Sequence, residues 1–319
     1  MKKMINRTHI SGLLYEHDLQ LRTSGPNSKK PGTVFIMGNV NLLTDPDGAA
    51  TNVVPVHFSY VTETTSSGSA NNTFKVLKDI IDGKYQSVTA NGADKATKFR
   101  IDSALGLNEF FVNRNGEETL VSAKRNEGGF IHASTDLEEN PNDRNTFETD
   151  ILITNVTRQE ENPERGIPER VVIKGAVFDF RNALLPVEFF ATNPNAMDYF
   201  EGLGASSKEP VFTKVRGRQI SATTVRKIEE ESAFGDTYVR EVQSSRREWI
   251  VTWAQGEPYL FDDESTITAN ELVEAMSQRE MTIAGIKKRQ DEYNATRANT
   301  ATKPAAAANT MAKVGDFNF

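Results

Sequence analysis

Val34-Phe35-Ile36-Met37-Gly38-Asn39-Val40 follows the pattern V-x-I-x-G-x-V, and Val171-Val172-Ile173-Lys174-Gly175-Ala176-Val177 repeats it. Two further matches occur in the same order: PVHF at residues 55–58 returns as PVEF at 186–189, and TKFR at 97–100 returns as TKVR at 213–216. Three matches in register predict that one structural unit is duplicated and that the chain forms two similar lobes.

The shared residues of the first match predict buried strand positions. Side chains along a strand alternate between two faces. We therefore expect Val34, Ile36 and Val40 to point into the core of one lobe, and their counterparts to do so in the other. The glycine of each copy, Gly38 or Gly175, is expected to allow the sharp bend that a small barrel needs.

The residues between the shared positions form the opposite face of the same strand. In the second copy they include Lys174, Phe178 and Phe180, and Arg181 follows directly. Aromatic rings beside cations suit a platform on which nucleic-acid bases stack. A strand buried on both faces would carry the same aromatic residues, so core packing stays open as an alternative.

In the third match, apolar and charged residues fall more clearly on opposite faces of the strand. Apolar residues alternate there with cations, which are Lys98 and Arg100 in the first copy and Lys214, Arg216 and Arg218 in the second. Such cations stand about 6–7 Å apart on one strand face and can follow a phosphodiester backbone. Residues 206–227 hold six Lys or Arg and one acid. An ordinary solvated face is the alternative.

Two tryptophans lie on a predicted strand near the end of the second lobe. Trp249 and Trp253 share one strand face with Val251 if the alternation is regular. This pattern favours core packing of both rings over base stacking.

Composition limits the classes of protein that the chain can represent. The 319 residues carry a net charge of -7, and no apolar run approaches the ~20 residues of a membrane span. Thr8 and His9 follow the basic start, so no secretion signal is expected. Cysteine is absent, which excludes disulfides and thiolate metal sites. A cytoplasmic protein is expected.

The order of predicted elements favours a mainly β fold with short interposed helices. Each lobe shows strands, a helix and then further strands, as in the five-stranded OB-fold barrel; a pair of β-sandwiches is the alternative. The expected segments are a first OB-like lobe at 1–133, a linker at 134–146, a second lobe at 147–262, a helix at 263–297 and a disordered tail at 298–319.

The motifs of common enzymes are missing from the sequence. The four histidines are scattered without metal-ligand spacing. There is no phosphate loop, no nucleophile elbow and no clustered acidic nuclease pattern. We therefore expect no enzyme, no catalytic residue, no cofactor and no metal.

The span from Asn6-Arg7-Thr8-His9 to Ile228-Glu229-Glu230-Glu231 resembles bacteriophage single-stranded DNA-binding proteins of Gram-positive hosts. The likeness lies in the strands I-x-G-x-V and P-V-[HE]-F, the segment A-M-D-Y-F-E at 196–201 and the basic strand after it. The resemblance lies in the general residue pattern and the strand order, without one diagnostic motif, and covers about four-fifths of the chain. The resemblance implies OB folds, sequence-tolerant binding of single-stranded DNA, and a role in phage DNA replication or recombination.

The end of the chain is similar to the partner-docking tails of such proteins. Those tails are acidic and end in an aromatic residue, and here Asp316, Phe317 and Phe319 are the corresponding residues. The resemblance implies docking of replication or recombination proteins. The tail departs from the pattern because Asp316 is its single acid, where several are usual.

Two other functions remain open at this point. The lobes could form a phage structural protein or an interaction adaptor without DNA binding, with the C-terminal helix driving assembly. The chain could also be an annealing factor, which binds single strands and pairs them. An oligomer is possible under each of these functions.

Overall fold

The computed structural model describes residues 4–26, 28–45, 51–114, 116–162, 167–231, 237–260 and 267–301. The first half holds β1 (Asn6–His17), β2 (Gln20–Thr23), β3 (Val34–Asp45), β4 (Thr51–Thr62), α1 (Asn72–Ile81), α2 (Val88–Asn91), η1 (Ala93–Lys95), β5 (Lys98–Arg114) and β6 (Glu117–Ala133). The second half holds η2 (Pro141–Asp143), β7 (Asn145–Gln159), β8 (Arg170–Phe178), β9 (Leu184–Ala191), α3 (Pro194–Gly202), β10 (Val211–Glu231), β11 (Thr237–Ala254) and α4 (Ala269–Ala301).

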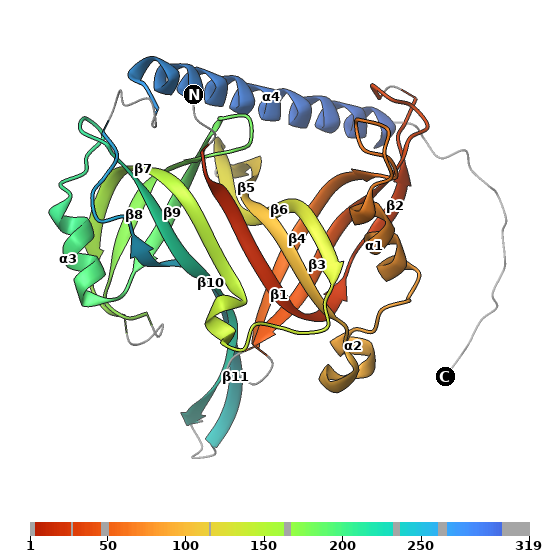
Figure 1. Ribbon diagram of the computed structural model, residues 1–319, viewed down its shortest axis with the longest axis horizontal. Helices are drawn as coiled ribbons and strands as arrows, with labels where there is room; N and C mark the ends of the chain where they lie inside the picture. The colour runs from red at the N-terminus through yellow and green to blue at the C-terminus, as the bar shows by residue number, and fades with distance from the viewer. Residues whose placement is uncertain are drawn as a thin grey trace, which may run out of the picture. The chain divides into compact units, whose positions relative to one another are not determined.

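The five long strands of the first half close into a barrel (Figure 1). β1 pairs antiparallel with both β3 and β5, β3 pairs with β4, and β4 pairs in parallel with β6, the neighbour of β5. α1 lies between β4 and β5 in the chain. Five strands in this closed order, with a helix after the third, form an OB-fold barrel.

The second half repeats the arrangement strand for strand. β7, β8 and β9 pair in sequence, β9 pairs in parallel with β11, and β10 pairs with both β11 and β7. α3 takes the place of α1. The two barrels are joined because β1 also pairs with β7, from Asn6 opposite Thr149 to Ile10 opposite Asn145. The predicted fold class is therefore confirmed: mainly β, with two OB-like barrels and a C-terminal helix.

The shared valine and isoleucine positions of the first repeated block are core residues in both barrels, with one exception. Ile36, Val40, Ile173 and Val177 are fully buried, whereas Val34 is 39% exposed because it begins its strand. Each repeated glycine lies beside a β-bulge. Gly38 follows a register shift in β3 and has a φ of +130°, and Gly175 faces the shift between Ile153 and Asn155 of β7.

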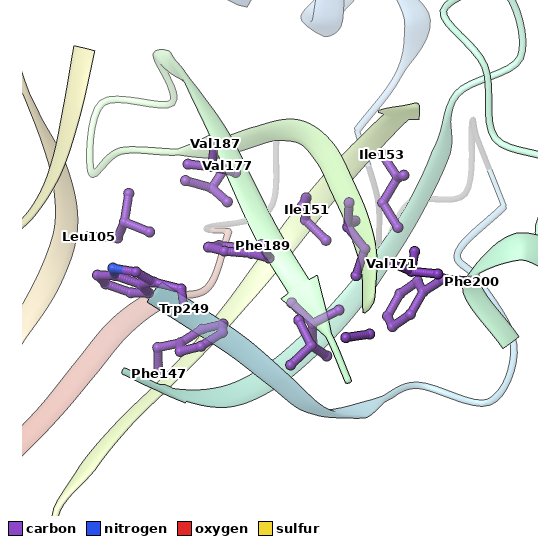
Figure 2. Packing of buried hydrophobic residues seen from close by; sticks show 14 of the residues in the cluster. Leu105, Phe147, Ile151, Ile153, Val171, Val177, Val187, Phe189, Phe200 and Trp249 are labelled. Carbon is purple, nitrogen blue, oxygen red and sulfur yellow. The ribbon is translucent and has the colours of Figure 1, made fainter. Parts of the chain in front are cut away.

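Aliphatic and aromatic side chains together fill the core of the second barrel (Figure 2). The ring centroid of Phe147 lies 5.0 Å from that of Phe189 and 5.1 Å from that of Trp249. A separate apolar layer covers part of the outer side of the same barrel. It brings together Met4, Leu152, Phe178, Leu184, Phe212, Ile267 and Ala275.

The tip of the β5–β6 hairpin (Glu109–Val121) and the described residues from Glu280 onward form a second compact unit. Within it, the side chain of Gln290 accepts a hydrogen bond of 2.8 Å from Phe111 N and donates one of 2.6 Å to Phe111 O. Lys287 pairs with Glu118 at 2.5 Å. The division of the chain into the five segments expected above stays a prediction, and residues 302–319 of the tail lie outside the described residues.

Candidate nucleic-acid interface

The cationic row of the second barrel follows the outer face of β10. Lys214 and Arg218 are half-buried and Arg216 is exposed, while Val215 and Gly217 between them are buried. This alternation is the one that the sequence predicts. Among the described residues, Lys214 makes no side-chain ion pair, whereas both arginines have partners.

Acids of the neighbouring strand β7 stand opposite this row. Lys214 faces Asp150 and Arg216 faces Glu148, whose carboxylate lies 3.0 Å from the Arg216 guanidinium. Arg7 of β1 donates to the same carboxylate. Burial alone would raise the pKa of Glu148, but the hydrogen bonds from Arg7 and Arg216 hold that pKa below its usual value. The face is therefore a ladder of mixed charges rather than a uniformly basic strip.

Trp253 adds an aromatic ring to the row, which the sequence pattern does not predict. β11 carries a bulge at Thr252, because Arg216 pairs with Trp253 but the next residue, Gly217, pairs with Val251. The extra residue reverses the alternation. Trp249 is consequently 6% exposed in the core, and Trp253 is 45% exposed on the outer face.

The ring of Trp253 lies against the cationic row at the edge of a cleft. The guanidinium carbon of Arg216 is 4.9 Å from the Trp253 ring centroid, a cation–π arrangement. The cleft has a volume of about 680 Å³. Its lining includes Trp253, Arg218, Tyr199 and the polar Thr192 and Asn193 at the start of α3. An exposed indole beside guanidinium and amide groups is able to stack on a base and hold the adjoining phosphate.

The cations of the first barrel contact the segment that joins the barrels. Lys98 Nζ donates to Thr135 O at 3.1 Å, and Arg100 pairs with Glu138 at 2.5 Å. The carboxylate of Glu138 also accepts hydrogen bonds from His9 and Ser11. Burial alone would raise the pKa of Glu138, but the hydrogen bonds from Ser11 and His9 and the charge of Arg100 lower it. Alternation along β5 is as predicted, with Phe99 and Ile101 in the core.

The residues of the predicted aromatic platform, on β8 and directly after it, do not share one exposed surface. Phe180 is 79% exposed with the Arg181 guanidinium 4.9 Å from its ring centroid, and Lys174 is exposed 3.8 Å from Glu188. Phe178 is 0% exposed, so the prediction of an outward ring is wrong for this residue. Its side of β8 is covered by the apolar layer that contains Phe212, 6.0 Å away between ring centroids.

The remaining predicted features fall partly outside the described chain. Asp316, Phe317 and Phe319 lie there. Among the residues that the structure does describe, no group of three or more His, Cys, Asp or Glu is arranged to hold a metal ion. None of the helices in the described part of the chain has the length and apolar character needed to cross a membrane.

Comparison with solved structures gives weak likenesses. A deletion mutant of the single-stranded DNA binding protein from Thermus aquaticus is 11% identical, covers 83% of this chain and 100% of its own, and gives a TM-score of 0.43. A hyperthermostable mutant of urate oxidase from Bacillus sp. TB-90 is 9% identical, covers 76% of this chain and 96% of its own, and gives a TM-score of 0.13.

Comparison at the level of families is more informative. No curated protein matches the chain. The model of the YorF family matches residues 4–295 and thus includes both barrels. The chain belongs to the YorF family.

Proposed function

We propose that this protein binds single-stranded DNA with little sequence preference, along the outer face of the second barrel. The observation that carries the proposal is the contact between Arg216 and Trp253 within the row of Lys214, Arg216 and Arg218. Cations that follow the backbone and a ring that stacks on bases are the two elements of sequence-tolerant binding. The OB topology supports the same general function, since barrels of this type bind oligonucleotides.

The proposal assigns different roles to the cations and the aromatic rings. Lys214, Arg216 and Arg218 neutralise successive phosphates, and a base enters the cleft against Trp253. Phe180 with Arg181 provides a second exposed ring and cation. Lys98, Arg100 and Lys174 would extend the basic path. On this proposal the protein coats and protects single strands during phage DNA replication or recombination. The tail residues Asp316, Phe317 and Phe319 would dock partner proteins.

A titration with a fluorescent oligo-dT across salt concentrations tests the proposal. We expect tight binding at low salt that weakens as salt rises, because neutralised phosphates release counterions. The three contacts of the β10 row alone predict a slope of log K against log salt of about -2 for a single strand, and every further phosphate contact makes the slope steeper. A complete lack of binding at low salt would contradict the proposed function.

Replacing Trp253 with Ala should weaken oligo-dT binding by about tenfold, because stacking on one ring contributes on the order of 1–3 kcal/mol. The salt slope should stay unchanged, since no phosphate contact is lost. Phe130→Ala serves as the matched control because Phe130 is an exposed ring on β6 of the other barrel. Equal losses in the two variants would show that Trp253 has no special role.

A further inference from the structure

One carboxylate of the inter-barrel segment accepts hydrogen bonds from three side chains on the outer face of the first barrel. Glu138 accepts from the guanidinium of Arg100 at 2.5 Å, from His9 Nε2 at 3.1 Å, and from the hydroxyl of Ser11. Ser11 is fully buried there. These donors come from two neighbouring strands, β1 and β5, so the barrel itself fixes their positions. They form an anion site that a residue of the same chain fills.

The neighbours of Glu138 engage further cations of the predicted DNA face. We define the strap as residues 134–144. Lys98 donates to the carbonyl of Thr135, and Arg218 of the second barrel donates to the side chain of Asn142. Three of the five row cations, Lys98, Arg100 and Arg218, therefore contact the strap. It occupies places where phosphate oxygens would lie if a strand followed both rows.

Backbone bonds hold the two ends of the strap. Ser134 N donates to Lys98 O at 2.9 Å, and Ser11 N donates to Arg144 O at 2.7 Å. Arg144 also donates to the carbonyls of Glu138 and Thr44 at 2.6 and 3.3 Å. The contact of the Glu138 side chain is different, because it is made only through groups that bind a phosphate equally well. Its release leaves both ends anchored.

The geometry points to a phosphate site made by His9, Ser11 and Arg100, which Glu138 blocks until a phosphodiester of single-stranded DNA displaces it. This inference rests on the proposed function and adds that the strap weakens the binding of single-stranded DNA. A carboxylate and a phosphate present similar oxygen acceptors to a guanidinium. Displacement unites the basic rows of the two barrels. Asp102 accepts from His9 Nδ1 at 2.7 Å and keeps this partner when Glu138 is displaced.

The test compares Glu138→Gln with Glu139→Gln in oligo-dT titrations of the full chain. Both variants lose one negative charge, but Glu139 is exposed and its side chain makes no hydrogen bond or ion pair among the described residues. Glu138→Gln should bind about tenfold more tightly than Glu139→Gln, because a charge-assisted hydrogen bond to be displaced is weakened.

The outcomes separate this inference from the proposed function. If the unmodified protein binds oligo-dT and the two variants bind equally, the strap plays no part and the inference is overturned, while the proposed function stands. If none of the three proteins binds at low salt, both ideas fail.

Hydrogen exchange of the unmodified protein provides a second measurement that does not depend on a variant folding. Saturating oligo-dT should increase exchange at the amides of Asp136 and Asn142, which donate to Ser134 Oγ and Asn140 Oδ1, because the middle of the strap is released. Unchanged or stronger protection of these amides would overturn the inference.

Discussion

Replacing Lys214, Arg216 and Arg218 together with Ala is expected to weaken oligo-dT binding by roughly 100-fold at low salt. Partly exposed charge contacts contribute about 1 kcal/mol each, and every 1.4 kcal/mol is a factor of ten in the dissociation constant. Loss of three phosphate contacts should also make the salt slope shallower by about 2. Fluorescence titrations at several salt concentrations measure both quantities.

The control for this variant removes three cations from elsewhere on the first barrel. Lys29, Lys30 and Lys95 are exposed and make no ion pair among the described residues. Their replacement by Ala changes the net charge by the same amount. If the control loses as much affinity and slope as the β10 variant, binding follows net charge alone and the interface on β10 is wrong.

The triple replacement is compatible with a folded barrel. Each of the three side chains lies on the outer face, while Val215 and Gly217 hold the inner one. Glu148 keeps Arg7 as a partner when Arg216 is removed. The expected loss therefore reports on binding, and an unchanged thermal unfolding midpoint would confirm that the barrel is intact.

The barrel topology could be predicted from the sequence because two copies of one pattern reinforce each other. Alternation assigned Ile36, Val40, Ile173 and Val177 to the core, and the structure buries all four. It also placed the cations of β5 and β10 on the opposite side. Such assignments depend only on the period of a strand, which is a local property of the chain.

The features that the sequence did not predict arise where local periodicity is interrupted or where distant segments meet. The bulge at Thr252 turns Trp253 outward, and no residue type in the strand marks that extra residue. The composition of residues 134–146 predicts a linker, but it does not predict that Glu138 contacts Arg100 and His9. That contact depends on how β1 and β5 come together, which a strand pattern does not encode.

Phe178 and Phe180 also show that a strand pattern does not predict contacts between distant segments. An apolar layer covers Phe178 and leaves Phe180 exposed. Both belong to the predicted outer face of one strand. Met4 and Ile267, which are far from Phe178 in the sequence, join the layer that buries it. Phe180 lies two residues later, beyond the end of β8, and has no such cover.

Replacing Phe178 with Ala should lower the free energy of unfolding by about 3–5 kcal/mol, because a fully buried ring leaves a cavity among Phe212 and its neighbours. Replacing Phe180 with Ala should change it by no more than about 0.5 kcal/mol, as expected for an exposed side chain. Urea unfolding measures both values. The oligo-dT titration should show the reverse order, with weaker binding for Phe180→Ala and near-normal binding for folded Phe178→Ala. A Phe178→Ala protein as stable as the unmodified chain would contradict the buried layer, since a ring on the surface leaves no cavity when it is removed.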